Sequence, residues 1–408
     1  MKLSELIKKK ALPSFCTSNL DVLKIILIYS QKKSLPCLIE STSNQVNQFG
    51  GYTNLKPKQF RKKILNLAKN IKFSKKKLYL GGDHLGPLPW KNEKSKISLR
   101  NSVILINDYI KANYCKIHLD TSIKCSDDKN INQAKIFDRT KYLLKKINLK
   151  NKINKIFLVI GSEVPLSGSN EKGKIKISKI NEIRDEINKF KKLLNKLYKK
   201  QISFALVIEP GMRYLNHTIS RPKLKNFLPK KKLSIKNNFF YEAHSTDYQS
   251  KNTLKKLVKN NFKFLKVGPE LTYYYARALF LMTEIEAELN ISTFSDLKIN
   301  LVKTMMNDKK YWKNYYSTKN KKLILNSQLD RMRYYLNYLS VERSIKRLSK
   351  NINSCEHKVI SKYLKNKKTK KEFDKLKNAK ISNFYKIVYV FMIEILNKYY
   401  SASGFKIT

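Results

Sequence analysis

The chain has 408 residues, of which 42% are hydrophobic and 11% aromatic, so it can bury a large core and is not a disordered chain. Its formal net charge is +56, from 86 Lys and Arg residues against 30 Asp and Glu residues. The excess is mostly Lys and is spread from residue 2 to residue 406. We interpret it as a bias toward A/T-rich codons rather than a nucleic-acid-binding face, which would concentrate the charge, although anionic substrates should still be attracted.

The cysteine pattern predicts a reducing, cytoplasmic environment. The five cysteines are odd in number and show no CxxC spacing, which indicates neither a disulfide framework nor a zinc knuckle: Cys16, Cys37, Cys115, Cys125 and Cys355. The first residues, MKLSELIKKKALPSFC, lack the long apolar core of a signal peptide. Apolar runs such as residues 388–396 are too short to span a bilayer, so we expect no membrane association.

Eight short segments are apolar, rich in β-forming residues and end abruptly in polar or small residues: Ser14–Thr17, Cys37–Thr42, Leu78–His84, Cys115–Asp120, Ile156–Glu163, Phe204–Glu209, Phe239–His244 and Phe262–Gly268. Lys-rich stretches with helical spacing lie between most of them, for example residues 178–197 and 254–260. This alternation predicts a parallel α/β sheet, and eight units are typical of a closed (β/α)8 TIM barrel. The alternative is a doubly wound open sheet, which usually carries a Gly-rich fingerprint after its first strand. Here that position reads FCTSNLD.

The character of the sequence changes near the end of the eighth segment. Tyr273–Leu289 reads as the final barrel helix, with Glu284 and Glu288 on its outer side. Further aromatic-rich segments read as helices: Tyr311–Tyr316, Asp330–Tyr338 and Asn383–Tyr400. We therefore predict a barrel over residues 1–290 and a helical C-terminal extension, residues 291–408, packed on the barrel.

Polar residues stand at the C-terminal ends of the predicted strands, the face where barrel enzymes carry their chemistry. In GGDHLGP, residues 81–87, the paired glycines let the backbone turn sharply and let a ligand approach closely. Asp83 offers a carboxylate for proton transfer, and His84 offers an imidazole for a metal. A structural turn with His84 hydrogen-bonded in the core explains this heptapeptide equally well.

Three further strands end in ionisable side chains. In KIHLD, His118 and Asp120 alternate with apolar residues, so we expect them to face the barrel interior or its mouth together with Lys116. If they are functional, His118 and Asp120 are predicted to be substrate or phosphate contacts, and a structural role is equally open for each. Glu163 and Glu209 close the next two strands, and a carboxylate there must be solvated, paired, protonated or bound to a metal.

The seventh and eighth strands end in groups suited to a phosphate. His244 is followed by two hydroxyl residues, and the loops after these strands are the usual phosphate site of the fold. The predicted substrate- and phosphate-binding residues are Ser245, Thr246, Asp247, Lys266 and Gly268. We interpret the two histidines away from strand ends, His217 and His357, as structural or incidental.

The loop after the second strand is dense in amides and hydroxyls. Amides both donate and accept hydrogen bonds, which suits sugar hydroxyls. The predicted substrate contacts are Asn44, Gln45, Asn47 and Gln48. The alternative is a loop that satisfies its own polar groups and caps the barrel.

Taken together, these segments resemble the GatZ/KbaZ family, the second subunit of class II D-tagatose-1,6-bisphosphate aldolase. The resemblance covers nearly the whole chain. It rests on IESTSNQVNQFGGYT (39–53), GGDHLGP (81–87), KIHLD (116–120), IGSEVP (160–165), EPG (209–211), YEAHSTDYQ (241–249), LKVGPELT (265–272) and DRMRYY (330–335). The long Asn/Gln loop and YEAHSTDYQ are specific, whereas GGDH alone is not.

The resemblance implies a barrel of the class II aldolase type. In catalytic class II aldolases, three histidines hold a divalent metal, usually Zn²⁺, and an Asp next to the first of them handles a proton. His84 and His244 match two of the metal positions, and Asp83 matches the proton-transfer residue. The third histidine has no match, because the sixth strand ends in Glu209. A His₂–Glu site suits Zn²⁺ or another divalent metal, and Glu163 is a further candidate ligand.

Four functions stay open on the sequence. The first is a non-catalytic subunit that supports a GatY/KbaY-like catalytic partner in cleaving tagatose 1,6-bisphosphate to dihydroxyacetone phosphate and glyceraldehyde 3-phosphate. The second is a stand-alone metal-dependent sugar-phosphate aldolase or ketose-phosphate epimerase that uses Asp83, His84 and His244. A tagatose-6-phosphate kinase is disfavoured, because the near match to a P-loop at residues 168–175 ends in Ile where Mg²⁺ coordination needs Ser or Thr. A nucleic-acid binder is disfavoured by the spread of the charge, and a homo-oligomer stays open.

Overall fold

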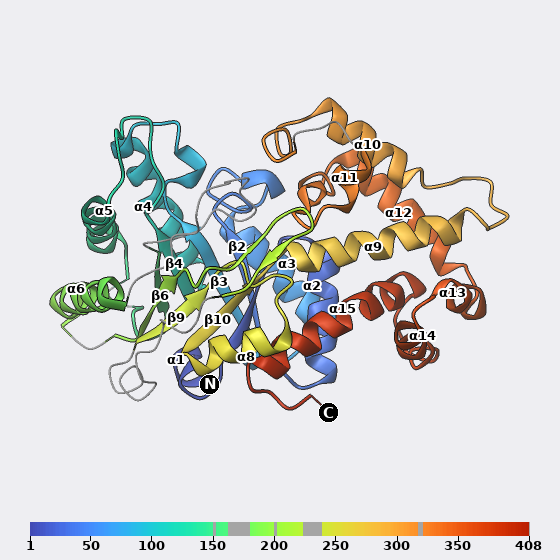
Figure 1. Ribbon diagram of the computed structural model, residues 1–408, viewed down its shortest axis with the longest axis horizontal. Helices are drawn as coiled ribbons and strands as arrows, with labels where there is room; N and C mark the ends of the chain where they lie inside the picture. Colours follow the sequence, from blue (N-terminus) through green and yellow to red (C-terminus); the bar gives the residue numbers. More distant parts are fainter. Residues whose placement is uncertain (150–151, 162–179, 200–201, 223–238, 317–320, 408) are drawn as a thin grey trace.

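The eight predicted strands form a closed parallel barrel. The computed structural model describes residues 1–149, 152–161, 180–199, 202–222, 239–316 and 321–407 (Figure 1). The strands follow one another round the barrel in the order β1-β10-β9-β6-β5-β4-β3-β2, and β1 pairs with both β2 and β10. They are β1 (Leu12–Cys16), β2 (Cys37–Thr42), β3 (Leu78–Leu85), β4 (Lys116–Asp120), β5 (Phe157–Gly161), β6 (Phe204–Ile208), β9 (Phe239–Ala243) and β10 (Phe262–Val267). The predicted (β/α)8 barrel is confirmed, and the open-sheet alternative is wrong because each of these strands has two neighbours.

Helices surround the barrel and connect its strands (Figure 1). They are α2 (Leu20–Lys32), α3 (Pro57–Asn70), α4 (Ser95–Lys111), α5 (Gln133–Lys146), α6 (Ile180–Tyr198), α8 (Lys251–Lys259) and α9 (Pro269–Glu286). Short elements in the connections are η1 (Gly51–Thr53), η2 (Lys75–Lys77), η3 (Leu88–Trp90) and the antiparallel pair β7 (Arg213–Tyr214) and β8 (Ile219–Ser220). One more helix, α1 (Leu3–Lys9), precedes β1, and its Leu6 and Ile7 join the apolar cluster inside the barrel. This helix closes the N-terminal end of the barrel, so the site must lie at the other end.

The inward side chains change from apolar to charged along the strands. Leu38 on β2 and Phe264 on β10 belong to the inner apolar cluster. Two residues further along these strands come Glu40 and Lys266, both buried. Because alternate residues of a strand share a face, the charged side chains form the layer nearer the C-terminal mouth.

The helical C-terminal extension is present and contacts the barrel helices. Its elements are α10 (Leu297–Asn307), α11 (Lys321–Asn326), α12 (Leu339–Asn353), α13 (His357–Tyr363), α14 (Lys367–Asp374) and α15 (Asn383–Ala402). Helix α15 was predicted from the sequence, and it contacts α2, α8 and α9. Near its end, Tyr399 donates a hydrogen bond of 2.7 Å to the carbonyl oxygen of Thr246 in the loop after β9. A domain division at residue 290 stays a prediction, since one continuous core joins the barrel to these helices.

Two aromatic-rich segments that were predicted as helices are not α-helical. Residues 310–315 form successive turns. Residues 330–338 contain only a 3-10 helix, η5 (Arg331–Tyr334), which follows Asp330 in the left-handed region with φ of 47°. The rings of the two segments contact each other, and Tyr311 stacks on Tyr334 with centroids 4.8 Å apart. This mutual packing, rather than a helical stripe, explains their aromatic content.

Candidate metal centre and its cavity

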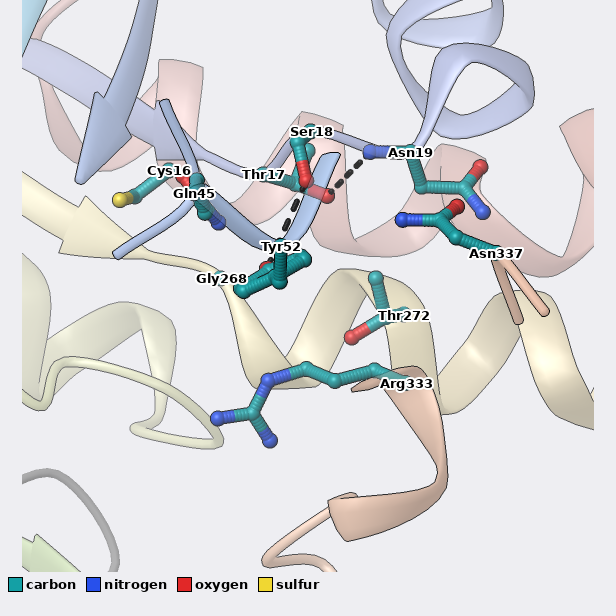
Figure 2. A pocket seen from close by; sticks show the side chains of 10 residues that line it. All are labelled: Cys16, Thr17, Ser18, Asn19, Gln45, Tyr52, Gly268, Thr272, Arg333 and Asn337. Atoms are coloured by element: carbon teal, nitrogen blue, oxygen red, sulfur yellow. Dashed lines mark hydrogen bonds between the residues drawn. The ribbon is translucent and has the colours of Figure 1, made fainter. Parts of the chain in front are cut away.

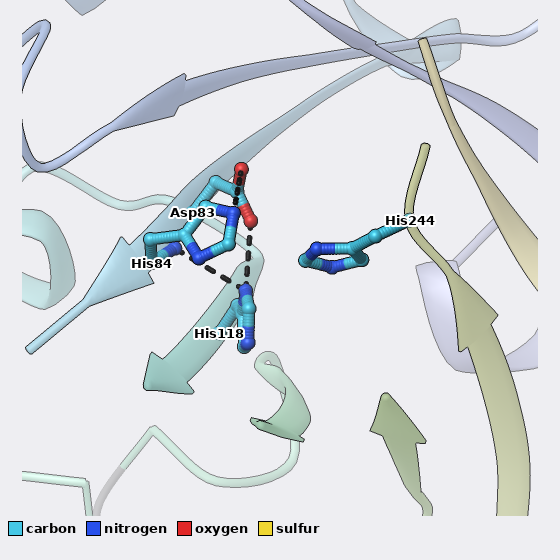
Figure 3. A group of neighbouring side chains, drawn as sticks. All are labelled: Asp83, His84, His118 and His244. Carbon is cyan, nitrogen blue, oxygen red and sulfur yellow. Dashed lines mark hydrogen bonds and ion pairs between the residues drawn. The ribbon is translucent and has the colours of Figure 1, made fainter. Parts of the chain in front are cut away.

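Three histidines meet at the C-terminal ends of β3, β4 and β9 (Figure 3). The ring centroids of His84 and His118 lie 5.0 Å apart, and the His244 ring lies 4.9 Å from the first and 5.2 Å from the second. One donor atom from each ring and one oxygen of Asp83 all lie within 4.8 Å of one another. The sequence grouped His118 with the substrate contacts and left a third metal position unmatched. The structure instead places His118 beside the other two histidines.

Each of these histidines is hydrogen-bonded to a carboxylate through one ring nitrogen. The Nδ1 of His118 lies 2.7 Å from Asp83, and the Nδ1 of His84 lies 2.9 Å from Asp120. On the opposite side of the barrel, His244 Nε2 lies 2.9 Å from the carboxylate of Glu242.

Each ring has a second nitrogen that could bind a metal, as in histidines that bind metal ions, and that of His84 lies 3.6 Å from the Asp83 carboxylate. The buried Nε2 of His118 has no hydrogen-bond partner in the part of the chain that the structure describes. Burial lowers the pKa of His244 to about 3, so its ring stays neutral, which is the form that binds a metal. Three imidazoles and a carboxylate are a donor set that fits Zn²⁺ and similar divalent ions.

The GGDH segment positions these groups through strain and close contact. His84 adopts φ of 48°, a conformation that is rare for residues other than glycine and that persists when the surrounding structure enforces it. The pairing of β3 with β4 shifts register between Gly82 and Leu85, which re-aims the strand end. A Cβ atom on Gly81 would lie 2.9 Å from the Glu40 side chain, and one on Gly82 would lie 2.6 Å from the ring of Tyr109. The glycines therefore provide space for close packing, while His84 itself makes the turn.

A network of buried ion pairs lies beside the histidines. The Lys116 ammonium lies 2.6 Å from a carboxylate oxygen of Glu40 and 2.6 Å from one of Glu242. Lys266 lies 2.5 Å from the other Glu40 oxygen and also pairs with Asp83. Although Glu40, Asp83 and Glu242 could by themselves hold a cation, each of the three already pairs with at least one of the two ammonium groups.

The network sets the ionisation of Asp83. Burial alone would raise its pKa, but the neighbouring His84 and Lys266 outweigh burial and hold the pKa well below its usual range. Sequence reasoning missed Glu40 and Glu242, although Glu242 shares the inward period of its strand with His244, which it did select. Their signal was a charged residue in an apolar strand, which burial makes costly unless the charge is paired.

A cavity of about 830 Å³ opens above the histidines. Its barrel side includes Asp83, His84, Asp120, His244 and Lys266, and its other side is formed by residues of the C-terminal extension: Lys310, Tyr311, Tyr315, Arg331, Arg333 and Tyr334. A neighbouring cavity of about 20 Å³, enough for a water molecule, lies between Gly268, Tyr52 and Arg333 (Figure 2). The larger volume suits a ligand of the size of a phosphorylated sugar.

The predicted loop amides divide into two pairs. Asn44 and Gln45 line the large cavity. Asn47 holds the loop itself, because its Nδ2 donates to Ser43 O at 2.9 Å and its Oδ1 accepts from the backbone of Phe49 and Gly51. Gln48 donates to the carbonyl oxygen of Asn101 at 3.1 Å, which fastens the loop to α4. The alternative of a loop that satisfies its own polar groups therefore describes Asn47 and Gln48. It also applies in part to Gln45, whose Oε1 accepts a hydrogen bond of 2.8 Å from the backbone of Thr42.

The residues predicted at the ends of β9 and β10 also divide. Ser245, Asp247, Lys266 and Gly268 line the large cavity. The Thr246 hydroxyl donates to the carbonyl oxygen of Lys266 at 2.5 Å. One Asp247 oxygen accepts from the backbone of Gly268 and Glu270, both at 2.9 Å, which caps the start of α9. Burial raises the pKa of Asp247 to about 6.

The glutamates predicted as metal ligands lie apart from the histidines or outside the described residues. Glu209 accepts hydrogen bonds from the backbone of Gly211 at 2.7 Å and Met212 at 3.1 Å, so its carboxylate holds the turn that follows β6. It is not in a metal-ligand group of the described residues. Glu163 and the P-loop-like residues 168–175 lie outside the described residues. His217 is exposed, and His357 stacks on Phe373 at 4.3 Å, both away from the site.

In the described ranges, no helix has both the length and the apolar character needed to cross a bilayer.

The family described as "D-tagatose-1,6-bisphosphate aldolase subunit GatZ/KbaZ-like" matches residues 2–404. Proteins named D-tagatose-1,6-bisphosphate aldolase subunit GatZ from Escherichia coli O6:K15:H31 (strain 536 / UPEC) and from Escherichia coli K12 are each 30% identical over 385 residues, 90% of this chain and 90% of theirs. The crystal structure of a probable tagatose 6 phosphate kinase from Sinorhizobium meliloti 1021 shares the fold, with a TM-score of 0.82 and 24% identity over 96% of this chain and 100% of that one. The chain belongs to the GatZ/KbaZ-like family of D-tagatose-1,6-bisphosphate aldolase subunits.

Proposed function

We propose that this chain is a subunit of a D-tagatose-1,6-bisphosphate aldolase and supports a catalytic class II partner of the GatY/KbaY type. The reaction cleaves the ketose bisphosphate to dihydroxyacetone phosphate and glyceraldehyde 3-phosphate. Support comes from the family match over residues 2–404 and from relatives that are named as subunits. The formal net charge of +56 would draw anionic sugar phosphates toward the chain.

The observation that carries the chemistry is the meeting of three imidazoles and a carboxylate, of which Asp83, His84 and His244 line the large cavity. We propose that His84, His118 and His244 hold a divalent metal, Zn²⁺ in the first place. When bound, such an ion polarises the carbonyl of a ketose phosphate. Asp120 and Glu242 would orient two of the rings through the hydrogen bonds described above.

Asp83 is the proposed proton carrier. Its low pKa makes it a carboxylate at neutral pH, so it can accept a proton from a bound sugar. The ion pair with Lys266 and the hydrogen bond to His118 fix its two oxygens in place. Asn44 and Gln45 on the cavity wall would bind sugar hydroxyls.

A second candidate function is a stand-alone metal-dependent aldolase or ketose-phosphate epimerase. The third imidazole favours it, because the incomplete ligand set expected from the sequence was the main argument against turnover by this chain alone. The chain alone and the chain with a partner subunit would be compared for bound metal and for cleavage of tagatose 1,6-bisphosphate. Stimulation of the partner without turnover by the chain alone supports the subunit role, and turnover alone supports the second candidate.

The metal role has its own variant and control. His84→Ala should lose bound metal, while His217→Ala, an exposed histidine outside the site, should keep it. Unchanged metal content in His84→Ala would show that His84 is only a core histidine. All five cysteines are free, which agrees with the proposal of a reducing, cytoplasmic location.

A further inference from the structure

Arg331 is a buried cation whose hydrogen bonds are incomplete. It lies in η5 on the C-terminal extension, and only 5% of its surface is exposed. One of its terminal nitrogens, Nη1, lies 3.3 Å from the Tyr334 hydroxyl. Its Nε and Nη2 have no hydrogen-bond partner in the described part of the chain. A buried guanidinium in this state is costly unless an anion completes it.

Arg331 contacts an aromatic ring in the wall of the large cavity. The guanidinium carbon lies 3.1 Å from the centroid of the Tyr315 ring. That contact holds the group in place without using its N–H groups for hydrogen bonds. Arg331 and Tyr315 both line the cavity that contains His84 and His244.

A second arginine adds positive charge at the same place. Arg333 lines the cavity too, and its Nη2 donates to the Tyr334 hydroxyl at 2.9 Å. Figure 2 shows Arg333 approaching from the extension, across from Gly268 and Tyr52 of the barrel loops. Burial would raise the pKa of Tyr334, but Arg333 and Arg331 outweigh burial and lower it, as expected where two cations converge.

We infer that Arg331, with Arg333 beside it, binds a phosphate monoester in the large cavity. A planar guanidinium with two unpartnered N–H groups matches the oxygens of a phosphate in a bidentate arrangement. The histidines come from barrel strands, whereas the arginines come from the extension on the other side of the cavity. We identify this phosphate as the one on the ketose carbon farther from the carbonyl group. That identification rests on the proposed function.

Binding measurements on the full-length chain test this assignment. Inorganic phosphate and D-tagatose 6-phosphate would be titrated calorimetrically into the wild type, Arg331→Gln, Arg331→Lys and Arg343→Gln. Arg343 lies exposed on α12, so its substitution removes the same charge from a distant surface. We expect Arg331→Gln to weaken both ligands by about tenfold or more, and Arg331→Lys to fall between it and the wild type. Arg343→Gln should bind like the wild type.

Two results would overturn the inference. One is wild-type affinity in Arg331→Gln, and the other is an equal loss in Arg343→Gln, which would assign binding to the general positive charge. If Arg331→Gln does not fold, Arg331→Lys decides, because wild-type affinity there would contradict the bidentate contact. Phosphate should also raise the Tm of the wild type more than that of either Arg331 variant.

The metal centre is measured separately in the same samples. Arg331→Gln should keep the metal content of the wild type, because Arg331 contacts none of the histidines. If the wild type binds no metal and supports no aldolase, but Arg331→Gln still weakens phosphate binding, the proposed function is refuted and the anion site stands. Tight binding of inorganic phosphate without binding of the sugar phosphate would refute the assignment of the ligand.

Discussion

The mouth of the barrel contains two groups of buried charged side chains that differ in whether each charge has a partner within the protein. In the barrel interior, Lys116 and Lys266 each pair with two carboxylates. On the extension, Arg331 lines the same cavity with two nitrogens that lack partners in the described residues. Each charge of the interior network has an ion-pair partner without a ligand, whereas the arginine group gains such a partner only when an anion binds.

This difference separates residues that organise the site from residues that recognise a ligand. A network whose charges are all paired in a low-dielectric interior fixes its side chains before a ligand arrives. An unpaired buried cation gains most when an anion replaces the water it has lost. The two groups should therefore respond oppositely to substitution, with stability at risk in one and affinity in the other.

The largest effect is expected from Lys116→Met in the interior network. The variant leaves Glu40 and Glu242 buried without the cation between them, which should lower the free energy of unfolding by about 3–5 kcal/mol. Urea denaturation measures this change. Lys111→Met, on the exposed face of α4, is the matched control and should stay within about 0.5 kcal/mol of the wild type. Equal stability of the two variants would mean that the network contributes little to folding.

Adding Glu242→Gln to Lys116→Met sharpens this test. Removing one of the two carboxylates that have lost Lys116 should recover part of the lost stability, because the cost comes from unpaired charge. A double variant that is less stable by the sum of both single losses would assign the effect to packing instead.

Asp330→Asn tests whether the neighbouring Asp330 supplies the negative charge that balances the arginine group. The Asp330 side chain accepts a hydrogen bond from Thr272, and burial raises its pKa from 3.8 to about 7. The folded chain thus holds this proton more tightly than the unfolded chain, and the stability it contributes is full below pH 3.8 and lost as the pH rises through 7. Relative to the wild type, Asp330→Asn should gain about 1 kcal/mol per pH unit between pH 5 and 7.

Unfolding of both proteins at several pH values measures that trend. Asn also tolerates the left-handed backbone at this position, so the substitution changes the charge without adding strain. A difference that does not vary with pH would mean that Asp330 is ionised in the folded chain. Asp330 would then balance the arginines, and the contrast between the two regions would fail.

The smallest effect is expected from Arg331→Met in phosphate-free buffer. Removing an incompletely bonded buried charge should change the free energy of unfolding by no more than about 1 kcal/mol, since the apolar side chain keeps the contact with Tyr315. Urea denaturation beside Lys116→Met gives the comparison directly. A loss as large as that of Lys116→Met would show that Arg331 has a structural partner after all.

The barrel could be predicted because each strand carries its own signal. Apolar β-forming residues give way to polar ones where the strand leaves the core, so the predicted segment Leu78–His84 nearly coincides with β3. The inward direction of Lys116, His118 and Asp120 also followed from the alternation in KIHLD. It is confirmed by the ion pair of Lys116 across the barrel and by the contacts of His118 and Asp120 with Asp83 and His84 on the neighbouring strand.

The composition of the histidine group could not be predicted in the same way. His84 and His118 lie on neighbouring strands, but His244 reaches them across the barrel from β9. Which strand ends converge depends on the tilt and stagger of the whole barrel, which no local spacing records. For this reason Glu209 was predicted as a metal ligand, and His118 was predicted only as a substrate contact. Arg331 gave no signal either, because the fold of the extension brings it to the cavity.

Zinc binding by wild type and His118→Gln tests the central claim most directly, since His118 is the histidine that only the structure placed in the group. Equilibrium dialysis should give about one Zn²⁺ per wild-type chain and an affinity more than about 100-fold weaker in His118→Gln. His217→Gln should match the wild type. Zinc binding by His118→Gln as tight as that of the wild type would contradict a metal centre built from these three histidines.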